Sequence, residues 1–390
     1  MDKEPKGRLV TDPAEFRAVV DGMRGAGKVG FDTEFVGERT YYPRLCLLQL
    51  GTEKEVVAVD PLALDDLSPL DELLFDPEVL KIVHAGWQDL KIFFQRTGRV
   101  PAPVFDTQIA ASVLGLPAQA AYASVVREFL GVDVKKGHSY SDWGARPLSA
   151  SQLAYALDDV RYLPELHDRM TARLRGEGRL SWIEPDLAAL ASPATYESDP
   201  EEEYRRVKGW AGLDRRRLAV LRGLIAWRER EARRRDVPRR RVLSDESALA
   251  IARSRAADEE GLRRVRGLEW KIGGDTSSAV LDAVRDALAL PEGRLPGPAS
   301  SRSRGNGERA SVVALLGALL RCRARVHRVA PEVLANAEDL ERLAAGERDG
   351  IPALSGWRLD LVGRELLALL EGKLSLFVHD GEATVEERRG

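Results

Sequence analysis

The feature that most constrains this sequence is the stretch VGFDTEF at residues 29–35, an apolar strand pattern that carries two carboxylates. Side chains two residues apart on a strand point to the same face, so Asp32 and Glu34 would lie side by side. Two like charges on a core strand destabilise the folded state unless a cation lies between them. The stretch therefore predicts a buried strand that forms part of a cation site.

Strand and helix patterns alternate over the first half of the chain. Apolar or alternating runs predict strands at residues 28–36, 45–51, 55–59, 80–84 and 104–105. Helical patterns cover residues 67–75, 87–95, 107–114, 121–129 and 149–174. The last of these opens with a Ser-x-x-Gln capping box at Ser149. Short connections favour antiparallel pairing of the first three strands. We therefore expect a mixed α/β sheet flanked by helices.

Strand patterns nearly vanish from about residue 204, and the pattern becomes helical. A long helix is predicted at 215–234, followed by shorter ones at 245–253, 258–265 and 277–288. A stretch rich in Gly, Ser, Pro and Arg then predicts a flexible linker. The predicted domains are an α/β domain (1–203), a first helical domain (204–292), the linker (293–308), a second helical domain (309–376) and a C-terminal tail (377–390).

Composition narrows the class of protein. The chain has 390 residues and is 44% hydrophobic, with no run of 18 apolar residues and no apolar segment near its start. We therefore expect no signal peptide, no membrane span and a cytoplasmic location. Cys46 and Cys322 lie far apart, and the five histidines form no metal-ligand pair, so zinc is not expected.

Charge is distributed unevenly along the chain. Residues 204–241 contain 15 Lys and Arg against 4 Asp and Glu, although the whole chain has a net charge of -3. An acidic body joined to a basic segment suggests catalysis with cations in one part and polyanion binding in another. The alternative is an arginine-rich helix face in water.

Two further acidic positions follow the first pair. Asp89 falls in the first turn of a predicted helix after a buried strand, where a carboxylate often serves only as a favourable helix N-terminal charge. Tyr155 and Asp159 lie four apart on a predicted helix and hence on one face, which a surface contact would also explain. The four carboxylates together, without histidine or cysteine, predict an oxygen-ligand site for two Mg²⁺ or Mn²⁺ ions. Tyr155 could then hold the attacking water.

The set Asp32-x-Glu34, Asp89 and Tyr155-x-x-x-Asp159 resembles the pattern of DEDDy-type 3′–5′ exonucleases, and within them the ribonuclease D family. The matching stretches cover most of the first 200 residues: FDTEFVGERTYYPRLCLLQL (31–50), VHAGWQDLKIF (83–93), FDTQIAASVLG (105–115) and SDWGARPLSASQLAYALDDVRYL (141–163). The resemblance implies an RNase H-like fold in which the four acids ligate two divalent ions and Tyr155 orients water. Later strands would run parallel to the first.

The helical regions resemble nucleic-acid-binding HRDC domains. Residues 221–252 carry the likeness for a first HRDC domain at about 212–290, and residues 310–372 look like a degenerate second one. HRDC domains also occur in RecQ-type helicases, but this sequence has no Walker A motif.

Several residues are candidate RNA contacts. Aromatic rings beside the acidic strand could stack on terminal bases, a loop before the Tyr155 helix could close over the RNA 3′ end, and two arginine runs could bind phosphates. Packing or solvated surface is the alternative for each. The candidates are Phe35, Tyr41, Tyr42, Lys135, Lys136, His138, Trp143, Arg146, Arg233, Arg234, Arg239 and Arg240.

The sequence thus predicts a metal-dependent 3′–5′ exoribonuclease. The resemblance implies that it trims the 3′ ends of structured RNA such as precursor tRNA and releases nucleoside 5′-monophosphates. Two alternatives stay open: an exonuclease acting on DNA, because the same acids serve both substrates, and an RNA-binding protein with an inactive nuclease fold.

Overall fold

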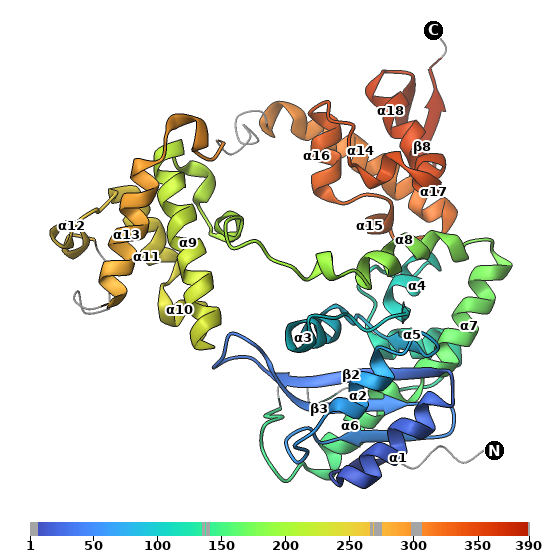
Figure 1. Ribbon diagram of the computed structural model, residues 1–390. Helices are drawn as coiled ribbons and strands as arrows, with labels where there is room; N and C mark the ends of the chain where they lie inside the picture. Colours follow the sequence, from blue (N-terminus) through green and yellow to red (C-terminus); the bar gives the residue numbers. More distant parts are fainter. Residues whose placement is uncertain are drawn as a thin grey trace. The chain divides into compact units, whose positions relative to one another are not determined.

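The computed structural model describes residues 7–134, 137, 141–265, 268, 275–297 and 306–388, which form two compact units (Figure 1). The first unit comprises the described residues of 1–35, 45–195 and 305–390. The second comprises residues 36–44 and the described residues of 196–304. The units do not follow chain order. The C-terminal region at 305–390 belongs to the same unit as the sheet. The loop at 36–44, which follows the strand with Asp32 and Glu34, belongs to the same unit as the helices at 196–304.

A six-stranded mixed sheet organises the first unit, which confirms the predicted α/β class. Its order is β1-β4-β3-β2-β5-β6. Strands β3 and β4 are antiparallel, whereas β5 pairs parallel with β2, β6 with β5, and β1 with β4. The strands are β1 (Arg8–Val10), β2 (Lys28–Val36), β3 (Arg44–Gly51), β4 (Val56–Val59), β5 (Leu80–Val83) and β6 (Val104–Asp106).

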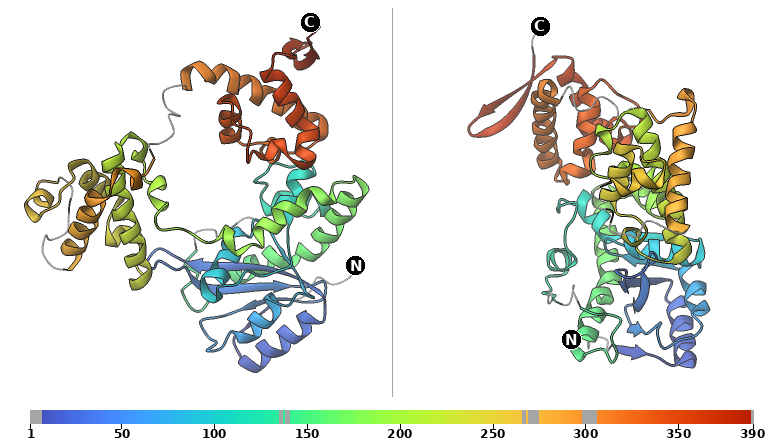
Figure 2. Two further views of the ribbon diagram at one scale, coloured as in Figure 1. Left: turned by 45° about the horizontal axis from the view of Figure 1, so that its top comes forward. Right: turned by 90° about the vertical axis from the view of Figure 1, so that its left-hand side faces the viewer.

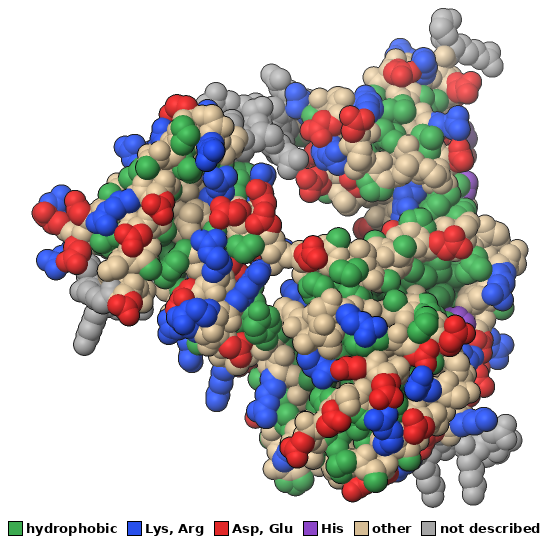
Figure 3. Space-filling view, viewed as in Figure 1, with side chains coloured by type: hydrophobic (Ala, Val, Ile, Leu, Met, Phe, Trp, Pro, Cys, Tyr) green, Lys and Arg blue, Asp and Glu red, His purple; other side chains and the backbone are tan. Residues whose placement is uncertain are grey.

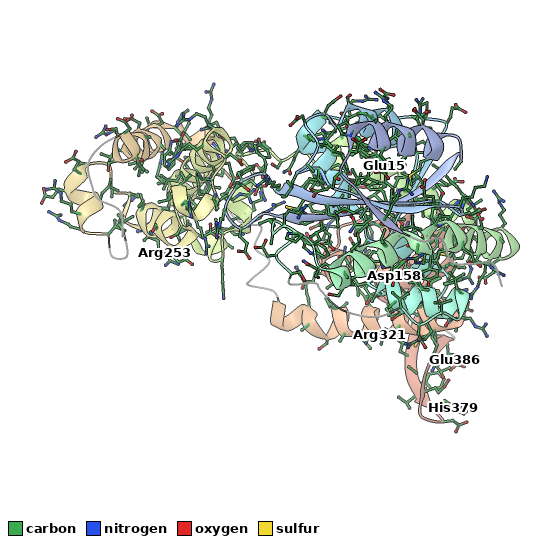
Figure 4. The ribbon with its side chains drawn as sticks, turned by 90° about the horizontal axis from the view of Figure 1, so that it is seen from below. Glu15, Asp158, Arg253, Arg321, His379 and Glu386 are labelled. Atoms are coloured by element: carbon green, nitrogen blue, oxygen red, sulfur yellow. The ribbon has the colours of Figure 1, made fainter. Side chains whose placement is uncertain are left out.

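Helices cover both faces of this sheet. Figure 4 shows the strands edge-on, with the helix that carries Glu15 on one side and the helix that carries Asp158 on the other. Apart from a few polar side chains, Asp32 and Glu34 among them, the strands between these layers are mostly apolar, as expected for strands covered on both sides. The helices are α1 (Pro13–Arg24), α2 (Ser68–Leu74), α3 (Trp87–Thr97), α4 (Thr107–Val113), α5 (Tyr122–Leu130), α6 (Ala150–Arg161), α7 (Leu163–Gly176) and α8 (Leu180–Leu190).

The prediction of a single helix at 149–174 is wrong in one respect: the region forms two helices, α6 and α7, separated at Tyr162. The predicted capping box at Ser149 is present and starts α6. Pro164 lies in the first turn of α7, where the missing N–H is tolerated. The proline ring disfavours helical backbone at the preceding residue, so α6 does not continue into α7. Strand β1 and helix α1 were missed by the sequence analysis.

The second unit is helical around an apolar core centred on the long helix α9. Asp214 caps the start of α9, and Asp236 ends it in the left-handed conformation with φ of 46°. The 3₁₀ turns η2 and η3 precede α9, and α11 and α13 pack along it. Its elements are η2 (Glu203–Arg206), η3 (Trp210–Gly212), α9 (Arg215–Arg235), α10 (Arg239–Val242), α11 (Asp245–Ser254), α12 (Glu259–Arg263), α13 (Asp275–Ala289) and η4 (Glu292–Arg294).

The C-terminal region has its own apolar core and packs on the sheet domain through helix α8. The rings of Trp182 and Trp357 stack with centroids 4.4 Å apart and planes 7° apart. Arg358 pairs with Asp186 at 2.8 Å. The elements are α14 (Asn306–His327), α15 (Pro331–Leu334), α16 (Ala337–Ala344), α17 (Gly356–Arg358), the π-helical turn η6 (Leu359–Gly363), α18 (Arg364–Leu370), β7 (Leu374–His379) and β8 (Glu382–Glu387).

The β7–β8 hairpin covers most of the predicted C-terminal tail at 377–390. The two strands pair in antiparallel register from Leu374 opposite Glu387 to His379 opposite Glu382. The turn Asp380-Gly381 has positive φ at both positions, which is the geometry of a two-residue hairpin turn. Figure 2 shows the hairpin projecting beside the C-terminal helices. No helix in the described part of the chain is long and apolar enough to cross a membrane.

Replacing Trp357 by Ala should loosen the C-terminal region from helix α8. The substitution removes the ring stacked on Trp182, so we expect the free energy of unfolding to fall by roughly 1–3 kcal/mol. Urea denaturation followed by tryptophan fluorescence measures this change. The control is Val378→Ala, because that side chain is 75% exposed. Equal midpoints for both variants and the parent would contradict the packing role.

Candidate active site

Three of the predicted acidic residues meet on one side of the sheet. Asp32 and Glu34 project from the same face of β2, and helix α6 brings Asp159 against them. One carboxylate oxygen from each residue lies within 4.8 Å of those of the other two. Three hard oxygen donors at this spacing are suited to a divalent cation such as Mg²⁺ or Mn²⁺.

The fourth acid, Asp89, lies in the first turn of α3 and is only 6% exposed. Its carboxylate accepts a hydrogen bond from the Thr33 hydroxyl, and its charge raises the pKa of Asp32. The preceding turn is fixed by Asp106, which accepts hydrogen bonds from the N–H groups of Ala85 at 3.1 Å and Gly86 at 2.9 Å. We call Asp32, Glu34, Asp89 and Asp159 the carboxylate cluster.

Two glycines allow helix α6 to approach the sheet closely. A Cβ atom on Gly51 would lie 2.8 Å from the carbonyl oxygen of Val160, and one on Gly30 would lie 3.2 Å from the same atom. Gly30 would also meet the side chain of Leu163 at 2.8 Å. Because Val160 follows Asp159, this close packing sets the distance between Asp159 and strand β2. The sequence analysis missed both glycines, although each stands at a regular strand position.

The cluster is electrostatically strained without a cation. Burial and then the charges of Asp89, Asp159 and Glu34 raise the pKa of Asp32 well above its usual range. Burial and the neighbouring carboxylates raise the pKa of Glu34 to about 8. Burial raises the pKa of Asp89 and that of Asp159 to about 7, partly opposed by hydrogen bonds from Thr33 and Tyr155. Binding a cation would relieve this repulsion.

Tyr155 lies on α6 one turn before Asp159, and its phenol donates a hydrogen bond to the Asp159 carboxylate. The predicted Tyr–Asp neighbourhood is therefore present. The Tyr155 ring also lies near the ring of Trp143, with centroids 6.3 Å apart and planes 32° apart. Aromatic pairs at this separation attract one another.

Two of the predicted RNA contacts, Trp143 and Arg146, also make contacts within the protein. Trp143 is only 3% exposed. The Arg146 guanidinium donates to the Asp60 carboxylate and to the backbone carbonyls of Cys46, Trp143 and Ala145. Trp143 is therefore packed in the core, whereas Arg146 is an exposed residue whose guanidinium is held by protein acceptors. RNA binding by these two residues stays a prediction. The predicted contacts Lys135, Lys136 and His138 lie outside the described residues.

Tyr41 is a hydrogen-bonding centre within the second unit. Its phenol donates to Glu229 at 3.1 Å and accepts from Arg233 at 2.9 Å and from Arg239 at 3.3 Å. The backbone N–H groups of Tyr41 and Tyr42 both donate to Asp236 Oδ1 at 3.0 Å. These bonds tie the loop at 36–44 to the C-terminal end of α9. Arg233 and Arg239, two of the predicted phosphate-binding residues, therefore also have a structural role within the second unit.

The other predicted contacts are more accessible. Tyr42 is 38% exposed, Phe35 is half-buried, and Arg234 pairs with Glu231 at 2.7 Å. Arg240 lines a pocket of about 430 Å³ together with Arg206. Figure 3 shows Lys and Arg side chains interleaved with Asp and Glu over this unit, so its positive charge is partly compensated. RNA binding by these residues stays a prediction.

His84 follows the end of β5, and both of its ring nitrogens have hydrogen-bond partners within the protein. Its Nδ1 lies 2.9 Å from the Thr107 hydroxyl and its Nε2 lies 3.0 Å from the Ala120 carbonyl oxygen. Burial lowers its pKa, which favours the neutral ring. It therefore anchors the strand end and is no ligand of the cluster.

Comparisons with known proteins agree with this geometry. Residues 8–175 match a 3′–5′ exonuclease family, and residues 217–273 match the HRDC domain. The chain is 45% identical to ribonuclease D of Gluconacetobacter diazotrophicus and 42% identical to that of Granulibacter bethesdensis, over at least 95% of each chain. The crystal structure of Escherichia coli RNase D, an exoribonuclease involved in structured RNA processing, superposes with a TM-score of 0.81 at 30% identity, over 94% of this chain and 99% of that one.

Gly51→Ala should separate helix α6 from the sheet. The added methyl group would meet the Val160 carbonyl, so we expect a loss of roughly 1–3 kcal/mol in the free energy of unfolding and a fall in nuclease activity. Denaturant titration and an exonuclease assay measure the two effects. Gly22→Ala is the matched control, because a Cβ there meets nothing within 4 Å and the position is helical. Parent-like activity in Gly51→Ala would refute the positioning role of the glycine.

The pKa values predict that the metal-free protein loses stability as pH rises and that a bound metal ion stabilises the protein more at higher pH. In the unfolded chain these carboxyls ionise near pH 4, but in the fold they keep protons up to pKa values of about 7 and about 8. The folded state therefore binds more protons in this window, and stability without metal falls as pH rises from about 4 to about 8. Metal binds the ionised carboxylates, so Mn²⁺ should raise Tm more at about pH 8.5 than at about pH 6.

Thermal unfolding with Mn²⁺ and with a chelator, at both pH values, tests this. The control is Asp32→Asn, which should remove most of the Mn²⁺-dependent rise. A rise that is equal at the two pH values would contradict the proton linkage.

Proposed function

This chain belongs to the ribonuclease D family of 3′–5′ exoribonucleases, and we propose that it hydrolyses RNA with two divalent ions held by the carboxylate cluster. The observation that carries the proposal is the convergence of Asp32, Glu34 and Asp159 within 4.8 Å. Their raised pKa values identify a site where negative charge is uncompensated by the described residues.

The chemistry of the donor set fits Mg²⁺ or Mn²⁺. All of the converging ligands are carboxylate oxygens, and His84 faces protein partners instead. Ions bound there would neutralise charge on the attacking and leaving oxygens of the phosphodiester. We propose that Asp32, Glu34 and Asp159 hold them, with Asp89 completing the set from helix α3.

Tyr155 would orient the nucleophilic water. Its phenol hydrogen-bonds to the Asp159 carboxylate, which places the phenol oxygen beside the carboxylate cluster, where it would accept a hydrogen bond from a water molecule. That water attacks the terminal phosphorus atom, and the bond from phosphorus to the 3′ oxygen of the preceding nucleotide breaks. The products are a nucleoside 5′-monophosphate and an RNA shortened by one nucleotide with a free 3′ hydroxyl. The rigid strand and helix hold these groups in place before the reaction.

The substrate that we propose is structured RNA with an accessible 3′ end, for example precursor tRNA. The HRDC domain in the second unit supports this, because its arginines exceed its acidic residues along α9 and α10. The domain would bind the RNA body, while the terminal nucleotides reach the carboxylate cluster.

Asp159→Asn should abolish most of the activity. The substitution removes one negative ligand, so we expect kcat to fall by roughly 100-fold or more with Mg²⁺ or Mn²⁺. Asp158→Asn is a closely matched control, since Asp158 pairs with Arg161 at 2.9 Å and is adjacent in sequence. Parent-like trimming of a 3′-labelled RNA by Asp159→Asn would refute the proposed metal site.

The substrate proposal is tested on matched nucleic acids. We expect 3′-extended tRNA and a single-stranded RNA oligonucleotide to be trimmed faster than the DNA oligonucleotide of the same sequence, because the 2′ hydroxyl distinguishes the two. Single-turnover rates measure the preference. Faster hydrolysis of the DNA would favour the rival assignment as a DNA exonuclease.

A further inference from the structure

We propose that Trp143 and Arg146 form a brace that positions the Tyr155 phenol, and that Arg146 acts through Trp143. The inference rests on the function proposed for Tyr155 and names two positioning residues for it. Both residues precede helix α6 in the segment at 141–149. All residues of the brace belong to the first unit.

Trp143 supplies the contact to Tyr155. The indole is 3% exposed, so it is fixed by its surroundings rather than free to rotate in solvent. Its ring lies 6.3 Å from the Tyr155 ring at a tilt of 32°. Tyr155 has to keep its phenol on Asp159 while its oxygen faces the water, and a ring packed against one side restricts its rotation.

Arg146 fixes the backbone at Trp143. One Nη1 proton goes to the Trp143 carbonyl oxygen at 2.8 Å and the other to that of Ala145 at 2.8 Å. Nε donates to Asp60 Oδ2 at 2.6 Å, and Nη2 donates to Asp60 Oδ1 at 2.7 Å and to the Cys46 carbonyl oxygen at 2.6 Å. All five N–H groups of the guanidinium therefore have acceptors within the fold.

The acceptors of Arg146 belong to the sheet. Cys46 lies on β3, and Asp60 directly follows β4. Asp60 is 3% exposed and also accepts from the Leu62 N–H at 2.9 Å, while its own N–H donates to Val10 at 2.9 Å. The Arg146 guanidinium lowers the pKa of Asp60 despite burial, so the pair stays ionised. The brace thus runs from the sheet, through Arg146 and Trp143, to the ring of Tyr155.

The brace has a different consequence from simple core packing. A residue that only fills the core changes stability. Its effect on kcat is independent of a second substitution, so the fold-losses of the two single variants multiply in the double variant. A residue that acts by positioning Tyr155 loses its effect once the Tyr155 phenol oxygen is gone. A double-mutant cycle between Trp143 and Tyr155 separates the two.

The experiment measures kcat and KM for the full-length protein on a short RNA oligonucleotide. Trp143→Leu should lower kcat about 3- to 10-fold and leave KM within about twofold, because the substrate-binding surface is untouched. Trp143→Phe keeps an aromatic ring and should restore most of that loss. Arg146→Lys should resemble Trp143→Leu, because an ammonium replaces the planar fork and cannot reach all four acceptor groups.

In the Tyr155→Phe background, Trp143→Leu should cause no further fall in kcat. Trp182→Phe is the control, since Trp182 stacks on Trp357 in the same unit and is expected to change stability alone. Circular dichroism and Tm establish that each variant is folded. Should Trp143→Leu fail to fold, the same cycle is run with Arg146→Lys and Tyr155→Phe.

Three results would overturn the brace. A folded Trp143→Leu with parent kcat would do so, as would losses that multiply in the double variant. Parent-like kcat in Tyr155→Phe would overturn the role proposed for Tyr155 and the brace with it. If Tyr155→Phe lowers kcat strongly and the kcat losses of the two single variants multiply in the double variant, the role of Tyr155 stands and only the brace is overturned.

Discussion

Repulsion among the clustered, largely buried acids beside strand β2 is the interaction on which this structure depends. Left alone, those charges would push helix α6 away from strand β2, and their raised pKa values record that tendency. The fold resists it through close packing: Gly30 and Gly51 let the Val160 carbonyl lie directly on the sheet. The protein thus keeps an anionic site assembled, and such a site is suited to cations and to reactions of phosphodiesters.

Much of the fold and site could be predicted because the signals are local. Asp32 and Glu34 are two apart on an apolar strand, and Tyr155 and Asp159 are four apart on a helix, so periodicity alone places each pair on one face. The close approach of α6 could not be predicted in this way. It depends on Gly30 and Gly51, whose meaning becomes visible only when the facing carbonyl is known.

Other features of the structure were not predicted, also for physical reasons. Trp143 and Arg146 were interpreted as RNA contacts because aromatic and basic residues in a loop are typical of nucleic-acid surfaces. The structure adds a pairing of Arg146 with Asp60, an acid 86 positions earlier, and such long-range pairing leaves no local pattern. The β7–β8 hairpin was missed because its strands are short and largely exposed, with Val378 75% accessible. Pro164 was overlooked as the boundary between α6 and α7.

The two helical regions take part in the structure in different ways. The C-terminal region packs on helix α8 through Trp357 and Arg358, so it is part of the same compact unit as the sheet. The middle region has a separate core and holds the loop at 36–44 through Tyr41 and Asp236. The middle region is a candidate for binding RNA, and the C-terminal region packs against the nuclease domain.

The central claim is that the carboxylate cluster binds divalent cations directly. The most direct measurement is the anomalous scattering of Mn²⁺ in crystals of the protein soaked with that ion. The account predicts two peaks roughly 3.5–4 Å apart, enclosed by the carboxylates of Asp32, Glu34 and Asp159. Crystals with full Mn²⁺ occupancy elsewhere and no peak beside Asp32 would contradict it.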